Sequence, residues 1–87
     1  MKTLQAYVER ENKFAALFNR SPLDLNNAAD RQRLAQKIDA ALSPENLTCD
    51  GELPRAEVQR RYKELTMVAK QLIKLDPTVA KFMYEFS

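Results

Sequence analysis

Apolar residues recur along the chain at intervals of three and four positions, which is the period of an amphipathic α-helix. Over the first segment this spacing predicts a helix from about residue 3 to residue 19, and Glu11 is the charged residue that interrupts its apolar side. The residues of that side are Leu4, Tyr7, Val8, Phe14, Ala15, Leu17 and Phe18.

The stretch RSPLDLNN, which follows, favours turns and helix caps over a continued helix. Asn26 or Asn27 is suited to cap a second helix, and Asp30 adds favourable negative charge to its first turn. The helix should end near Leu42, because Ser43-Pro44 is better suited to starting a turn or a new helix. Its predicted buried stripe is Leu34, Ala35, Ile38, Ala41 and Leu42.

A third and longer helix is predicted from Pro54 to about Leu75. Its apolar face comprises Val58, Tyr62, Leu65, Ala69 and Leu72, widened by Val68 and Leu75. A short C-terminal helix then begins with Asp76 as its cap and Pro77 in its first position. Its apolar side, which should close the core, is formed by Val79, Phe82, Met83 and Phe86.

These elements predict one all-α domain over residues 1–87, a small bundle of three long helices plus a short C-terminal helix. The chain has a single glycine and no strand pattern, and it is rich in residues that lose little rotamer freedom in a helix. The composition, 45% hydrophobic and 30% charged, is typical of a globular protein rather than a disordered one.

The absence of histidine and the single cysteine argue against most enzyme classes. The chain lacks the usual zinc ligands, the usual general base and any Ser/His or Cys/His nucleophile pair. We therefore expect a non-enzymatic protein without a cofactor. Cys49 has no partner for an internal disulfide, and no apolar run approaches the roughly 18 residues that cross a bilayer. Both features favour a cytoplasmic protein that is not in a membrane, and they leave open whether Cys49 is reactive.

The stretch NLTCDGELPRAE, residues 46–57, resembles the EF-hand calcium loop. The candidate ligands that this resemblance implies are Asn46, Thr48, Asp50, Glu52 and Glu57. However, a neutral amide stands at the first position and Pro54 at the ninth, so few ionic ligands remain. A bend explains the same residues: Gly51 adopts a left-handed turn, Leu53 enters the core and Pro54 opens the next helix. We therefore expect no metal here.

Charge is distributed unevenly along the chain. The segment from Asp39 to Glu52 contains acidic residues and no basic one, whereas the third predicted helix is mainly basic. Arg60, Lys63, Lys70 and Lys74 lie at helical spacing on the side opposite its apolar face, with Arg61 beside them and Met67 among them. Such a stripe suits nucleic acid phosphates, but lysine-rich helix faces are also common as plain solvated surface or as the electrostatic contact with a partner protein.

Methionine and tyrosine on a surface favour protein contacts, which adds Tyr84 to the candidate residues. The predicted partner-binding residues are Arg60, Arg61, Lys63, Met67, Lys70, Lys74 and Tyr84. All four phenylalanines lie in the first and last predicted helices, more aromatic bulk than such short helices need, so a homodimer through these faces is a further expectation.

Together these features predict a small helical adaptor or regulatory protein that acts through protein–protein contact. The alternative is a nucleic-acid-associated or nucleoid-associated regulatory factor that uses the basic stripe on the third helix.

Overall fold

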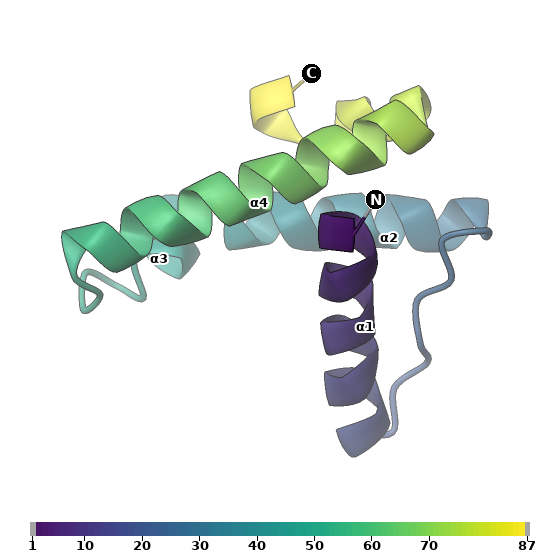
Figure 1. Cartoon of the computed structure of the whole chain (residues 1–87), viewed down its shortest axis with the longest axis horizontal. Helices are drawn as coiled ribbons and strands as arrows, with labels where there is room; N and C mark the ends of the chain where they lie inside the picture. The colour runs from purple at the N-terminus through teal and green to yellow at the C-terminus, as the bar shows by residue number, and fades with distance from the viewer. Residues whose placement is uncertain (1, 87) are drawn as a thin grey trace.

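The computed structural model describes residues 2–86, and the side chains of residues 3–84 and 86. It contains three long helices, α1 (Lys2–Leu17), α2 (Ala28–Ala41) and α4 (Arg55–Leu75), with the single-turn α3 (Pro44–Leu47) between α2 and α4. Two short 3₁₀ segments, η1 (Pro77–Phe82) and η2 (Tyr84–Phe86), follow α4 (Figure 1). The described residues form no strand, so the all-α prediction is confirmed.

The caps that define α2 and η1 lie where local chemistry predicts them. Asn27 caps α2 through its side-chain oxygen, which accepts a hydrogen bond from the backbone N–H of Asp30 at 3.1 Å. Asp76 caps η1 by accepting from the backbone N–H of Thr78 at 3.1 Å, and Pro77 follows it in the first turn. The C-terminal segment is 3₁₀ rather than α-helical, a geometry common in pieces of only one or two turns.

The core lies between α2, α4 and the C-terminal segment, which packs against both long helices. Its fully buried large side chains come from each of these elements and from the start of α1: Leu4, Leu34, Ile38, Val68, Leu72, Val79 and Met83. Phe82 and Phe86 are partly buried against this cluster. The prediction that the C-terminal segment closes the core is therefore confirmed.

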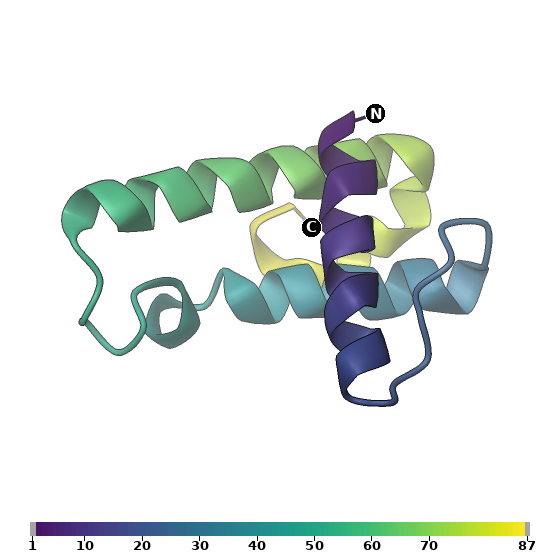
Figure 2. The same ribbon diagram turned by 60° about the horizontal axis from the view of Figure 1, so that its bottom comes forward.

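Helix α1 lies across α4 and α2 rather than alongside them (Figures 1 and 2). Leu4, Tyr7 and Val8, in its first two turns, are buried. The backbone N–H of Leu4 is one of the amides that a helix start leaves without a partner inside the helix, and it donates to Oε1 of Gln71 on α4 at 2.8 Å. The residues of α1 that belong to the core cluster therefore all come from its first half.

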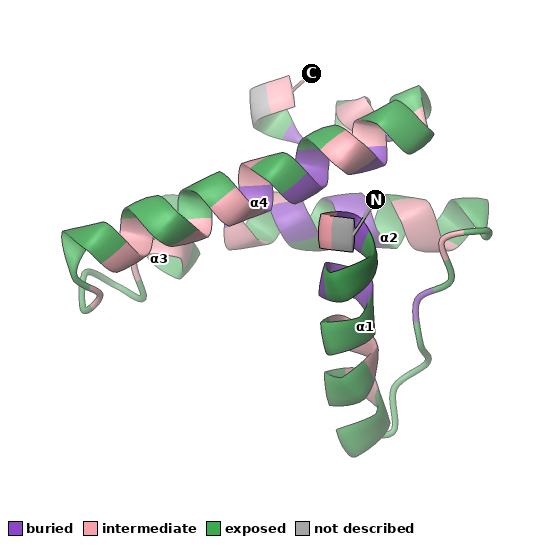
Figure 3. Ribbon diagram, viewed as in Figure 1, coloured by how far each residue is buried: buried purple, intermediate pink, exposed green. Residues whose placement is uncertain are grey.

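Three residues predicted to share the buried side of α1 are exposed instead. Phe14, Leu17 and Phe18 are 55%, 76% and 63% accessible to solvent. The expectation of a buried face was wrong for this half of the helix, because α1 continues past the two helices that it crosses (Figure 3).

The apolar face of α4 is also narrower than predicted. Leu65, Val68, Ala69 and Leu72 are buried, whereas Tyr62 and Leu75 at its margins are exposed. Leu53, expected in the core, is half-buried and lies outside the core cluster. The buried residues of α4 are therefore only those that α1, α2 and η1 cover.

Candidate functional site

The basic stripe predicted on α4 is reduced in the structure to three lysines and a methionine. Lys63, Lys70 and Lys74 are exposed, and within the described part of the chain none of them forms an ion pair. Met67 is also exposed among them. Their spacing of three and four residues aligns them along one outward face of the helix.

Arg60 and Arg61, the other two basic residues of the predicted stripe, differ from the lysines because both bind acceptors within the protein. Arg60 holds the carboxylate of Glu57 through two nitrogens, at 2.8 and 3.3 Å, and lies 3.6 Å from Glu64. The hydrogen bond from Arg60 lowers the pKa of Glu57. Arg61 points inward: its Nη2 donates to the backbone carbonyl of Asn46 at 3.2 Å, and its Nε is buried without a hydrogen-bond partner among the described residues.

Tyr84, the predicted partner-binding residue in the C-terminal segment, is 88% exposed. Its backbone N–H donates to Oδ1 of Asp39 on α2 at 2.9 Å. It therefore lies on a different element from the lysines.

The loop with the EF-hand resemblance directs its polar groups to its own backbone and to neighbouring helices. Asn46 Nδ2 donates to the carbonyl of Ala40 at 2.8 Å, and the Thr48 hydroxyl donates to that of Pro44 at 2.7 Å. Glu57, which would be the bidentate ligand, is bound to Arg60. Among the described side chains, those of residues 3–84 and 86, no group of three or more Asp, Glu, Cys or His residues converges.

The backbone of the same loop explains its sequence as a bend. After α3, the N–H of Asp50 donates to the carbonyl of Glu45 and that of Cys49 to Asn46, the pattern of a Schellman helix end. Cys49, Asp50 and Gly51 all have positive φ, at 49°, 59° and 86°, so the predicted left-handed turn at Gly51 is confirmed. Pro54 directly precedes α4, which begins at Arg55, one residue after the predicted start.

The sequence prediction was wrong for the outer half of α1, whose large apolar side chains are exposed rather than buried. We call Phe14 and Leu17 of α1, together with Phe18 in the turn that directly follows it, the distal patch. The helix ends in a well-formed Schellman motif, in which Arg20 N–H donates to Ala15 O at 2.8 Å and Asn19 N–H to Ala16 O at 3.4 Å. Asn19 takes the left-handed conformation that this motif requires, with φ of 56°.

The connection from α1 back to α2 is fixed beside the distal patch. Asn12 on α1 uses both halves of its side-chain amide on one residue of the connection: Nδ2 donates to Leu23 O at 3.0 Å, and Oδ1 accepts from Leu23 N at 2.7 Å. Leu23 is buried. The pair therefore holds Leu23 of the connection against α1, just before the distal patch.

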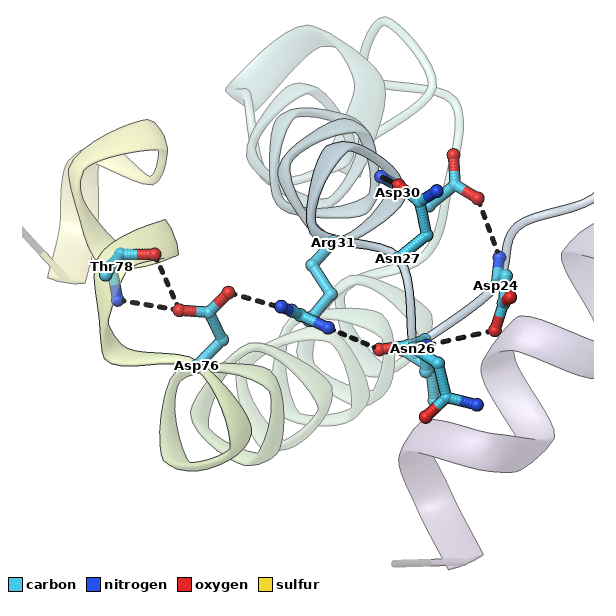
Figure 4. A network of polar contacts seen from close by, with 8 residues as sticks. Asp24, Asn26, Asn27, Asp30, Arg31, Asp76 and Thr78 are labelled. Atoms are coloured by element: carbon cyan, nitrogen blue, oxygen red, sulfur yellow. Dashed lines mark hydrogen bonds and ion pairs between the residues drawn. The ribbon is translucent and has the colours of Figure 1, made fainter.

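Further along, a polar network holds the connection to α2 and to the end of α4 (Figure 4). Arg31 Nε donates to Asp76 Oδ2 at 2.8 Å, and its Nη1 donates to the carbonyl of Leu25 at 2.8 Å. Hydrogen bonds from Thr78 and then Arg31 lower the pKa of Asp76. Asp30 also accepts from the backbone of Asp24 at 3.0 Å. This network is structural, because every member is used to anchor backbone or to cap a helix.

A hollow of about 330 Å³ opens between the outer half of α1, the connection and α2. Its lining includes the apolar Phe14 and Leu23, and also the basic residues Arg20 from the connection and Arg33 and Lys37 from α2. Arg33 pairs with Asp30 at 3.3 Å, whereas Arg20 and Lys37 form no ion pair within the described residues. The guanidinium carbon of Arg20 lies 5.4 Å from the centre of the Phe18 ring, within the distance of a cation–π contact.

Comparison of the chain with protein-family models, with curated proteins and with solved structures finds no match. Within residues 2–86, no helix combines the length and the apolar character needed to span a membrane.

Proposed function

We propose that this protein is a small non-enzymatic adaptor or regulatory protein that acts by binding another protein, and that the distal patch of α1 is its main contact surface. The observation that carries the proposal is the exposure of Phe14, Leu17 and Phe18 on a helix that is ordered to its end. A cytoplasmic location, favoured by the lone cysteine, is part of the same proposal.

The energetic argument starts from the apolar area that these three side chains present to water. Burying one phenylalanine or leucine completely is worth about 1.5–3 kcal/mol. Aromatic residues, phenylalanine included, are enriched at protein interfaces, where a few side chains account for most of the binding energy. Large apolar side chains gathered on an exposed surface usually mark a contact site.

The rigidity of the patch also favours binding. The Schellman motif ends α1 in a defined geometry, and the Asn12–Leu23 pair fixes the connection beside it. A surface that is already ordered loses less conformational entropy when a partner binds.

Site-specific photo-crosslinking in the native cell tests this proposal. A photoreactive residue in place of Leu17 should capture a discrete protein, and the same residue in place of Gln59, on the exposed side of α4, should not. The captured protein, once purified, should bind the wild-type chain and lose at least tenfold in affinity for the Phe14→Ser/Leu17→Ser variant. Equal capture from both positions, or none from position 17, would contradict the proposal.

The second candidate function is nucleic acid binding by α4, and it rests on the unpaired lysines Lys63, Lys70 and Lys74. Three phosphate contacts correspond to a slope of about −2.7 in log affinity against log salt. Affinity for an unrelated duplex would then fall about 40-fold between about 50 and 200 mM salt. A Lys63→Gln/Lys70→Gln variant that binds DNA as the wild type does would exclude this face.

A further inference from the structure

We propose that the occupant of the distal patch is an acidic amphipathic helix of the partner protein, with its apolar residues on Phe14, Leu17 and Phe18 and its carboxylates at the rim of the adjoining hollow. This inference rests on the proposed function, since it names the chemistry of the partner at the same surface.

The shape of the surface favours a helix as the occupant. Phe14, Leu17 and Phe18 lie at relative positions i, i+3 and i+4, so they form one ridge about one turn long. The hollow runs beside this ridge, between α1 and α2. A ridge beside a groove is the geometry in which two helices interdigitate, and apolar anchors at i, i+3, i+4 and i+7 are typical of a helix bound in a groove.

The charges at the hollow favour an acidic occupant. Arg20, Arg33 and Lys37 contribute the cations, and only Arg33 has an acidic partner, Asp30. The acidic residue among the lining is Glu11, which also borders a neighbouring hollow together with Arg10 and Arg61. Carboxylates of a partner would therefore meet Arg20 and Lys37, whose charges are not neutralised by an ion pair within the described residues. Charge complementarity of this kind selects partners and speeds their association.

The same charges argue against a second copy of this chain as the occupant. In a symmetric dimer through the distal patch, each copy would bring its own Arg20 and Lys37 to the contact, and like charges facing each other are unfavourable. The chain's own acidic segment, around Glu45, Asp50 and Glu52, lies at the far end of α2 (Figure 1). Its docking on the patch of another copy would be head-to-tail and would build a closed ring or an open chain of copies.

An anionic membrane is an alternative occupant of the distal patch, because it also combines acidic and apolar groups. The hollow favours a protein side chain, because a flat bilayer interface cannot fill a concave site whose lining includes Asn12, Ser21 and Arg33. Vesicle binding is therefore included as an outcome of the test.

Three designed helical peptides serve as probes for the full chain. The first has leucines at i, i+3, i+4 and i+7 flanked by glutamates, the second replaces the glutamates with lysines, and the third replaces the leucines with serines. Titration by fluorescence anisotropy should show the glutamate peptide binding at least tenfold more tightly than either of the others. Arg20→Glu/Lys37→Glu should reverse the preference between the first two, whereas the matched control Lys63→Glu/Lys70→Glu on α4 should not.

Several results would overturn this inference. With the peptides, these results are equal or tighter binding of the lysine peptide, no binding of any peptide, or binding that is unaffected by Leu17→Ser. With other partners, they are Leu17-dependent binding to vesicles of anionic phospholipid or Leu17-dependent dimers in light scattering. The photo-crosslink separates the two proposals. If the segment captured from position 17 is not an acidic helix, this inference fails and the proposed function stands; if nothing is captured, the proposed function itself fails.

Discussion

The inner and outer halves of α1 carry similar apolar side chains in opposite environments. Leu4, Tyr7 and Val8 are buried against the bundle, whereas Phe14, Leu17 and Phe18, on the following turns, are exposed. Amphipathic periodicity therefore defines which side of a helix is apolar, and the crossing geometry decides how much of that side the protein itself covers. The uncovered part is the best candidate for a contact surface.

The largest expected difference between the two halves is in stability. Leu4→Ala removes a fully buried side chain and should lower the free energy of unfolding by about 3 kcal/mol, a large share for so small a domain. Leu17→Ala, at an exposed position, should change it by about 0.5 kcal/mol or less. Urea unfolding followed by circular dichroism measures both. Comparable losses would show that the outer half of α1 is packed in solution.

The boundary between the halves is at Asn12, and its removal should have the next largest effect. Asn12→Ala leaves the N–H and carbonyl of Leu23 without their partners and should cost about 1–2 kcal/mol. Hydrogen exchange at the Leu23 amide should accelerate in parallel. The matched control is Lys13→Ala, an exposed neighbour that should leave both measurements unchanged. An unchanged Leu23 amide in Asn12→Ala would contradict the pairing.

The inner half should also make stability depend on alkaline pH. Burial raises the pKa of Tyr7 to about 12, against about 10 in an unfolded chain. A group with a raised pKa in the folded state stabilises fully below its unfolded value, so this contribution is present below about pH 10 and is lost as the pH rises towards about 12. Tyr7→Phe should lose less stability than the wild type across that interval in urea unfolding. Identical pH profiles would mean that the phenol is solvated.

The smallest effect is expected for the ion pair near the middle of the helix. Arg10 lies 3.0 Å from Glu64 on α4, and both side chains are substantially exposed. Exposed pairs of this kind contribute little, so Arg10→Gln should cost about 0.5 kcal/mol or less, and less still at high salt. A larger loss that persists at high salt would show that packing of Arg10 over the Tyr7 ring, at 5.3 Å, dominates instead.

Several features of the fold could be predicted because they depend on neighbouring residues only. Asn27 caps α2, Asp76 and Pro77 start the C-terminal segment, and Gly51 adopts a left-handed turn, each through bonds or torsions within a few residues. The buried stripe of α2 at Leu34 and Ile38 follows in the same way from the helical period. The candidate site was less predictable: the three lysines of α4 are exposed as expected, but Arg61 turns inward to a carbonyl that is distant in sequence.

By itself the sequence determined the number and approximate ends of the long helices and the apolar side of each, because capping, turn chemistry and periodicity act over a few residues. Only the tertiary structure decided which apolar residues are covered. That outcome depends on α1 crossing α4 and α2, and the crossing is fixed by contacts between distant segments, such as Leu4 with Gln71 on α4. Phe14, Leu17 and Phe18 fit the apolar pattern as well as Leu4 does, but no described part of the chain reaches far enough to cover them.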